Sequence, residues 1–220
     1  MSYFTKFPNV LYSFGDERER ASFQNMALYV EVIDKLKDNA SFYNDHYIRD
    51  GQRADNVSNT LYGDPSYHWT FYLMNDKLRE HGWPLDRLEL DKKIKEDFPN
   101  LVLKTDDEIF TIFKVGQTVQ GNSGQGTIAY RNLDLGQVVL KDVTGSFADG
   151  ELVTSNDGAE SITVTASMSE YLATHHYNDD VPVTNYEHYQ EKNDGLRSIS
   201  VIRKDAIRDI TRLFSQAMNS

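Results

Sequence analysis

The chain has 220 residues, with 34 Asp and Glu against 23 Lys and Arg, a formal net charge of −11, six His and no Cys. This length suits one domain or two small ones, and an aromatic content of 12% is more than an acidic disordered protein would carry. The lack of cysteine excludes disulfides, thiolate zinc sites and cysteine catalysis. The acidity argues against a nucleic acid partner, because affinity for a phosphate backbone comes largely from Lys and Arg.

Membrane insertion and export are not expected either. No window approaches the roughly 18 consecutive apolar residues that a transmembrane helix requires, and the N-terminal segment lacks a basic stretch followed by an apolar one. These exclusions leave proteins, carbohydrates or small molecules as partners.

The N-terminal segment combines aromatic side chains with a charged run over residues 16–20. Such an arm is typical of a segment that packs on another protein, and folding back onto its own domain would explain it equally well. The arm residues predicted to form a protein interface are Phe4, Phe7, Leu11 and Tyr12. Residues 26–36 come next, and their apolar spacing fits a strand or a helix, with the β-branched content favouring a strand.

A strand and two short helices are predicted between residues 41 and 75. Residues 41–48 alternate aromatic and polar side chains, as a strand does, up to the turn pair Asp50-Gly51. A helical pattern then runs over 55–63, where a glycine is suited to end the helix. A second helix starts after Pro65, so the two helices form a compact hairpin.

The middle of the chain is predicted to be rich in β-structure. A charged helical segment, 88–98, precedes short apolar runs that are separated by Gly-rich turns. This spacing is typical of a small closed β-barrel, which we place at about residues 106–155. Within it, 113–121 and 147–155 form a weak internal repeat: an aromatic residue, a glycine three positions on, then a strand.

The C-terminal segment reads as a strand over 196–203 and a last helix after Asp205, whose apolar positions recur every three or four residues. An amphipathic helix must bury its stripe, either in its own core or against a neighbouring subunit. The helix residues predicted to form a protein interface are Ile210, Leu213 and Phe214.

No motif points to an enzyme. Acidic clusters lie at 106–108 and 179–180, but glycoside hydrolysis needs two carboxylates held roughly 5 to 10 Å apart across a cleft, and neighbours in sequence are typical of a solvated turn. Three histidines between 175 and 188 have no spacing that completes a metal site. The Gly-rich segment 121–126 lacks the Lys-Ser/Thr ending of a phosphate loop. We therefore expect no catalytic residues, no metal and no cofactor.

The stretch from Tyr47 to Asp76 carries a recognisable order: a strand ending in a Gly turn, a helix ending in Leu-Tyr-Gly, a second helix with a Trp, and a final Asn-Asp. This order resembles the LysM module. It is more closely similar to the baseplate wedge protein family typified by gene product 53 of the T-even phages, which has a LysM-like core. The matching residues are Arg53, Asp55, Leu61, Tyr62, Gly63, Trp69, Asn75 and Asp76. Ala54 stands where that family usually has Pro, and the C-terminal strand and helix also resemble the family's ending.

The resemblance implies an α+β fold, in which a LysM-like core of two short helices against a two-stranded sheet is interrupted by an inserted small β-barrel-like domain. The C-terminal strand and helix would complete the core. We accordingly expect the strand near 46–49 to pair with 197–203, which brings the two ends of the insertion close together.

The domain ranges expected from this arrangement are 1–25 for the arm, 26–104 for the first part of the core, 105–165 for the inserted β-rich domain, 166–195 for a linker, and 196–220 for the C-terminal strand and helix.

In function, the resemblance implies a structural component of a phage tail baseplate that joins wedge subunits and clamps neighbouring wedges into the sixfold baseplate. The expected partners are other baseplate wedge proteins and neighbouring wedges, with the sheath-like wedge subunit as one candidate, in six copies per baseplate. The chain would be assembled in the host cytoplasm and reside in the virion. The alternative is a LysM-type tail protein that binds glycan, namely peptidoglycan. A tail-associated lysozyme would need Asp107 or Glu108 in a cleft, and we expect no lytic activity.

Overall fold

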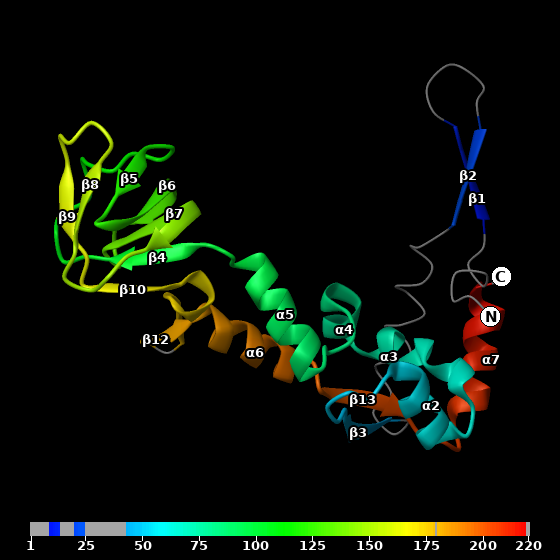
Figure 1. Ribbon diagram of the computed structural model, residues 1–220. Helices are drawn as coiled ribbons and strands as arrows, with labels where there is room; N and C mark the ends of the chain where they lie inside the picture. The colour runs from blue at the N-terminus through cyan, green and yellow to red at the C-terminus, as the bar shows by residue number, and fades with distance from the viewer. Residues whose placement is uncertain (1–8, 14–19, 25–42, 179, 219–220) are drawn as a thin grey trace. The chain divides into compact units, whose positions relative to one another are not determined.

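The computed structural model describes residues 9–13, 20–24, 43–178 and 180–218. Over these residues the protein is a mixed α+β structure with antiparallel sheets, which confirms the predicted fold class at this level (Figure 1). The chain divides into two compact units, one made of residues 1–86 and 193–220 and the other of residues 87–192. The segment 26–36, where strand and helix were both open, lies outside the described residues.

The predicted N-terminal arm contains a β-hairpin. Strands β1 (Asn9–Ser13) and β2 (Arg20–Gln24) pair in antiparallel fashion, and Tyr12 lies opposite Ala21. Leu11 on β1 is 65% exposed. An isolated two-stranded hairpin is at best marginally stable in water.

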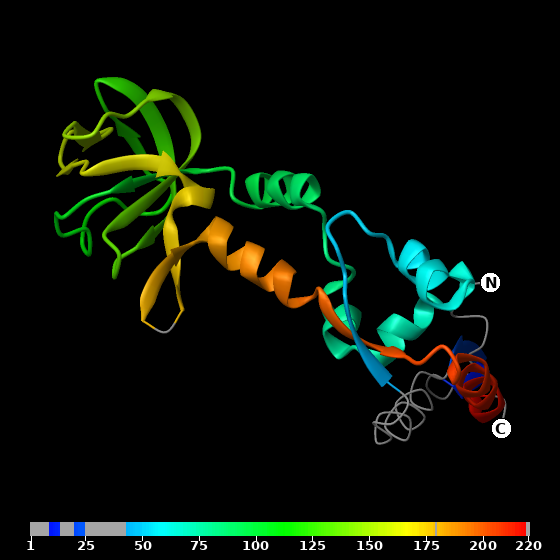
Figure 2. The ribbon, with the colours of Figure 1, turned by 90° about the horizontal axis from the view of Figure 1, so that it is seen from below.

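A second two-stranded sheet joins distant parts of the first unit. Strand β3 (Tyr43–Tyr47) lies beside β13 (Ser198–Ile202) and pairs with it in antiparallel fashion (Figure 2). Ile199 lies opposite His46. The backbone N–H of Ile48 continues the ladder by donating to the carbonyl of Arg197 at 2.8 Å. The long-range pairing predicted from the sequence is thereby confirmed.

Short helices connect and cover this sheet. They are α2 (Ala54–Tyr62), the 3-10 turn η3 (Pro65–Tyr67), α3 (Trp69–Met74), α4 (Asp76–His81) and the C-terminal α7 (Ile207–Met218). Gly63 ends α2 in the left-handed conformation, with φ of 75°, as its position predicted. Helix α4 was not predicted, because its six residues are mostly charged and only Leu78 is buried.

Two apolar clusters form the core of the first unit. One joins α3, β13 and α7 through Trp69, Leu73, Met74, Ile202, Ile207, Ile210 and Phe214. The other packs α2, α3 and α4 against the sheet through Ile48, Val57, Phe71, Leu78, Leu196, Ile199 and Val201. The stripe of α7 is therefore buried against its own chain, and the rings of Trp69 and Phe214 lie 5.1 Å apart.

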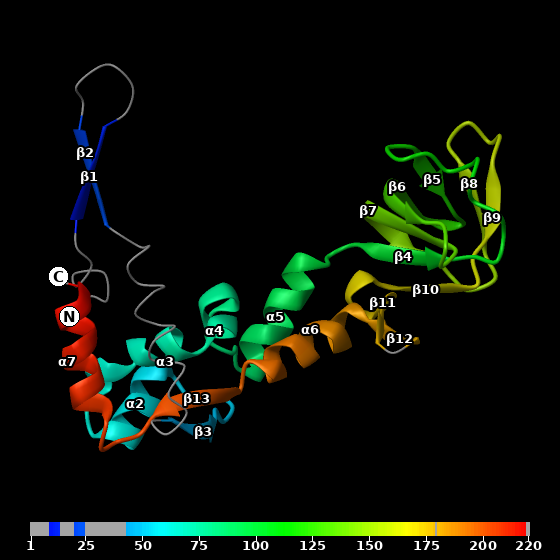
Figure 3. The same cartoon turned by 180° about the vertical axis from the view of Figure 1, so that it is seen from behind.

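The second unit is built on a seven-stranded antiparallel sheet in the order β10-β4-β7-β6-β5-β8-β9 (Figure 3). Its strands are β4 (Leu101–Lys104), β5 (Thr118–Gln120), β6 (Ser123–Asn132), β7 (Gln137–Ser146), β8 (Leu152–Ser155), β9 (Ser161–Thr163) and β10 (Ala166–Ser169). The sheet curls around an apolar core but is not a closed barrel, so this part of the prediction needs correction. Strands β9 and β10 follow each other in the chain and form the two ends of the sheet, where β9 pairs with β8 and β10 pairs with β4.

The weak internal repeat corresponds to two equivalent turns. Phe113 and Phe147 are both buried in the core of the curled sheet. Each is followed three residues later by a glycine with positive φ, 87° at Gly116 and 81° at Gly150, and then by a strand. The two strands that follow, β5 and β8, pair with each other.

The prediction that 166–195 is a linker is wrong. Strand β10 is followed by the 3-10 turn η4 (Glu170–Leu172), the hairpin β11 (Thr174–Asn178) and β12 (Val181–Thr184), and helix α6 (Asn185–Gly195). Helix α5 (Arg87–Asp97) and β4 also belong to the second unit, which is wider than the expected 105–165. The sequence did not predict these elements because polar and aromatic contacts stabilise them, and such contacts leave no periodic apolar pattern.

Candidate functional site

The residues predicted to form a LysM-like motif act mainly as the framework of the first unit. The hydroxyl of Tyr62 donates to the carbonyl of Ile202 at 2.9 Å, which ties the end of α2 to β13. Burial raises the pKa of Tyr62 to about 12, against the opposing effect of its hydrogen bonds with Thr70 and Ile202. Trp69 is only 8% exposed and fills the core between α3 and α7.

Asn75 joins the helices to the sheet. Its Nδ2 donates to the carbonyls of Phe71 and Ser200, both at 2.8 Å, and its Oδ1 accepts from the N–H of Ser200 at 2.8 Å. The amide therefore ends α3 and binds β13 at the same time. Its neighbour Asp76 starts α4 and forms an ion pair with Arg79.

The start of the motif lies on the surface. Arg53 has an 80% exposed side chain and pairs with Asp55 at 3.5 Å, in the first turn of α2. Leu61 is half-buried and packs against the second apolar cluster. These positions place the motif partly at the surface and partly in the core.

Two residues outside the predicted motif, Trp83 and Arg197, fix the loop between β3 and α2. Trp83 Nε1 donates to the carbonyl of Gln52 at 2.6 Å. Arg197, which is 7% exposed, binds the carboxylates of Asp50 at 2.8 Å and Asp194 at 3.1 Å. Sequence reasoning missed Arg197 because an arginine beside a strand carries no signal that its partners lie far away in the chain.

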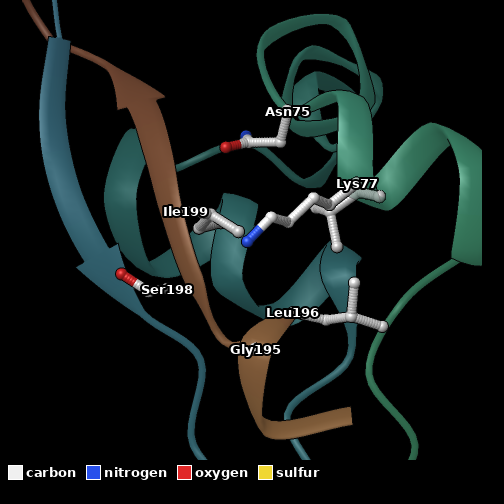
Figure 4. Close-up of a pocket in the computed structure, with 7 residues that line it drawn as sticks. Asn75, Lys77, Gly195, Leu196, Ser198 and Ile199 are labelled. Carbon is white, nitrogen blue, oxygen red and sulfur yellow. The ribbon is translucent and has the colours of Figure 1, made fainter. Parts of the chain in front are cut away.

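A pocket of about 230 Å³ lies between α4 and the start of β13. Its lining residues are Asn75, Lys77, Leu78, Gly195, Leu196, Ser198 and Ile199. Figure 4 shows the amine of Lys77 extending toward Ile199 across the pocket. Because the amide of Asn75 is already bound to the backbone, Lys77 is the main side chain that could hold a ligand here.

The predicted interface residues fall into three groups. Leu11 is 65% and Leu213 is 53% exposed, so both are open to a partner. Ile210 and Phe214 are 4% and 1% exposed, and their own chain covers them, which corrects their assignment to a protein interface. Phe4 and Phe7 lie outside the described residues, and for Tyr12 the structure describes the backbone in β1.

The second unit contains a buried polar network around Glu170, which is 3% exposed. Its carboxylate accepts from the hydroxyl of Tyr130 at 2.6 Å and from the N–H of Asn100 at 3.1 Å. Burial, with Glu170 beside it, raises the pKa of Tyr130. The network continues through Asn185, whose Nδ2 donates to the carbonyl of Glu170, to the imidazole of His176.

Two of the features weighed for catalysis have structural roles. The carboxylate of Asp107 accepts from the N–H of Thr163 at 2.6 Å, on the edge strand β9. The Gly-rich segment 121–126 covers the turn after β5 and the start of β6, and Gly121 N–H donates to the carbonyl of Gly124 at 2.8 Å. Among the described residues, which exclude Asp179, no cluster of His, Asp and Glu could hold a metal ion.

Within the part of the chain that the structure describes, no helix has the length and apolar character needed to cross a membrane. A comparison with models of known protein families gives no match to this chain, and a comparison with curated proteins gives none either.

Proposed function

We propose that the protein is a structural component of a contractile phage tail baseplate, which joins wedge subunits and clamps neighbouring wedges together. The proposal starts from the resemblance of residues 47–76 and of the C-terminal segment to the wedge protein family. In this proposal β3, α2, η3 with α3, and β13 form the LysM-like core, and residues 87–192 form an insertion into it.

The single observation that supports the proposal most strongly is the part played by Asn75. A motif that served only a binding groove would present this amide to a ligand, whereas here all three of its hydrogen bonds join α3 to β13. Trp69 and Tyr62 likewise serve packing and backbone contacts. The motif thus maintains a rigid core, which suits a protein whose role is to hold others in place.

The surfaces available for wedge contacts carry exposed apolar side chains. Leu11 on β1 and Leu213 on α7 are more than half exposed, which is a property of interface centres rather than of core residues. The net charge of −11 suits basic patches on the partners.

The direct test is assembly. The full chain is co-expressed with the wedge proteins of a contractile tail from the same genome, and complexes are examined by size-exclusion chromatography and electron microscopy. We expect wedge- or ring-shaped particles that contain the chain. Leu213→Glu should weaken assembly without unfolding the chain, while Leu88→Glu on α5, where the leucine is 81% exposed, serves as a matched control. A chain that elutes alone with every wedge protein contradicts the proposal.

Binding of peptidoglycan is the second candidate, and the pocket beside Lys77 is the observation that favours it. A pull-down of the full chain on purified peptidoglycan separates the two functions. Saturable binding that is lost in Lys77→Ala, with Lys92→Ala on α5 as the control, would favour the glycan function. If the chain does not bind peptidoglycan but assembles with wedge proteins, the result favours the structural role.

A further inference from the structure

The hairpin β11–β12 is attached to helix α6 through ionisable side chains. The imidazole of His176 on β11 stacks on that of His188 on α6, with ring centres 3.7 Å apart and planes 11° apart. Near the hairpin tip, Asn178 Nδ2 donates to the carboxylate of Glu191. At the start of α6, the carboxylate of Glu187 accepts from the N–H and the hydroxyl of Thr184 at 2.8 and 2.9 Å.

The hairpin has little apolar burial of its own. Tyr177 and Val181 are 58% and 60% exposed, and none of the described residues of β11 and β12 is fully buried. Its position against α6 therefore depends on the polar and stacking contacts rather than on a hydrophobic core, whose contribution would not vary with pH.

The hydrogen bonds fix the protonated nitrogen of His176. Asn185 Nδ2 donates to the carbonyl of Glu170 at 2.9 Å, so its Oδ1 faces His176 and accepts from Nε2–H at 2.9 Å. Nδ1 is consequently the ring nitrogen that carries no hydrogen in this tautomer.

Burial and the neighbouring charged groups change the pKa values of the histidines at this contact. Burial is the largest cause of the lowered pKa of His188, and the nearby His176 and Lys192 lower it further. Glu191 acts in the opposite direction. Burial also lowers the pKa of the adjacent His175, against the effect of Glu170.

The remaining contact of the stack comes from an aromatic side chain. The ring of Tyr189 meets both imidazoles edge-on. Two imidazolium rings stacked at this distance would repel each other, and among the described residues no carboxylate accepts a hydrogen bond from either ring.

We propose that the His176–His188 stack is an acid-sensitive latch, which holds the β11–β12 hairpin on α6 at neutral pH and releases it on acidification. The attached state binds fewer protons than the released state, because attachment lowers the pKa of His188 below its ordinary value of 6.5. Attachment therefore weakens as the pH falls below 6.5, by up to about tenfold per pH unit for each proton taken up. This inference does not depend on the baseplate proposal.

Hydrogen exchange of the full chain tests the latch at pH 7.5 and 5.5, with rates corrected for the intrinsic pH dependence. Both values lie above the ordinary Glu pKa of 4.5, so the carboxylates stay charged and the histidines dominate the difference. We expect protection of residues 174–184 to fall at least about fivefold at pH 5.5, while β6 and β7 keep theirs. Equal protection of the hairpin at both pH values would overturn the proposal.

A ring that cannot take up a proton should keep the latch closed. In His188→Phe, stacking remains, and we expect hairpin protection to be the same at both pH values. His81→Gln, at an exposed position of the first unit, is the control and should retain the wild-type response. A fall in hairpin protection at pH 5.5 in the phenylalanine variant refutes the proposal.

A second readout on the unaltered chain covers the case in which His188→Phe disturbs folding. The Cε1 carbon shifts of the histidines are followed by NMR between pH 8 and 5. A midpoint for His188 below 6.5 that coincides with shifts of hairpin amides supports the latch. A midpoint at or above 6.5 contradicts it.

Discussion

The side chain of Asn193 forms two hydrogen bonds with the backbone of Leu85, 108 positions earlier in the chain: Leu85 N–H donates to Oδ1 at 2.8 Å, and Nδ2 donates to the Leu85 carbonyl at 3.0 Å. Arg197 Nη2 reaches the same carbonyl at 3.1 Å. These contacts fasten the point where the chain leaves the first unit to the point where it returns. An inserted unit with adjacent ends disturbs its host little, which explains how residues 87–192 interrupt the core without separating β3 from β13.

Removing this contact should loosen the first unit. We expect Asn193→Ala to lower the free energy of unfolding by about 1–3 kcal/mol, because the N–H of Leu85 would lose its partner in a part-buried site. Urea unfolding followed by tryptophan fluorescence measures the change, since Trp83 packs against Phe71 in this unit. Gln190→Ala, at an exposed position of α6, is the control. Equal stabilities of the two variants would show that the contact does not hold the unit together.

The last helix offers a direct comparison of two neighbouring residues. Phe214→Ala should lower the free energy of unfolding by about 3–5 kcal/mol, because the ring packs beside Trp69 in the core. Leu213→Ala should change it by less than about 0.5 kcal/mol, since this side chain is 53% exposed. Urea unfolding of both variants measures the difference. If Phe214→Ala kept its stability but lost assembly, the ring would belong to an interface after all.

Two glycines with similar backbone angles should respond differently to alanine. Gly145 and Gly158 have φ of 79° and 69°, a conformation that costs an L-residue about 1–2 kcal/mol. A Cβ at Gly145 would also lie 1.9 Å from the carbonyl oxygen of Ser123 on β6, whereas a Cβ at Gly158 meets nothing within 4 Å. We expect Gly145→Ala to lower Tm much more than Gly158→Ala, as measured by calorimetry. Similar Tm values would argue against the β6–β7 register.

The second unit should lose stability in acid. The carboxylate of Glu151, 6% exposed, accepts from the N–H of Ala148 at 2.7 Å and from that of Asn122. These bonds lower the pKa of Glu151 below 4.5. A carboxyl whose pKa is lower in the folded state stabilises it above the unfolded value, and this contribution disappears as the pH falls through the folded value.

We therefore expect acid unfolding, followed by circular dichroism, to begin below pH 4.5, and the pH dependence to be smaller in Glu151→Gln. The glutamine retains one acceptor oxygen and cannot titrate, so this variant should be less stable at pH 7 yet lose less stability on acidification. Glu96→Gln, on the exposed face of α5, provides the control. A variant with the same pH dependence as the natural chain would rule out this role of Glu151.

Several elements could be predicted because their signals are local. Gly63 ends α2 since a left-handed residue suits glycine, and the apolar spacing of α7 follows from its 3.6-residue period. The pairing of β3 with β13 was also foreseen, but from a resemblance to a family rather than from periodicity.

The misses have physical causes of two kinds. Residues 166–195 were predicted as a linker because the η4 turn, the hairpin and α6 are held by hydrogen bonds and aromatic contacts, which leave no apolar period. The closed barrel was wrong because the strands form a curled sheet with ends at β9 and β10, and how far a sheet curls depends on tertiary packing, which has no clear sequence signal.

The composition and the local patterns by themselves determined that helices and strands share the chain, that α2 ends at Gly63, and that disulfides and thiolate sites are absent, since these depend on residue types and near neighbours. The tertiary structure decided which apolar stripe is core, as for Phe214, and which remains exposed, as for Leu213. It alone brought Asn193 to Leu85, Asn75 to Ser200 and His176 to His188. The contact of Asn75 with Ser200 supports the proposed function, and that of His176 with His188 supports the proposed latch. Such contacts depend on the path of the whole chain, so no local sequence pattern predicts them.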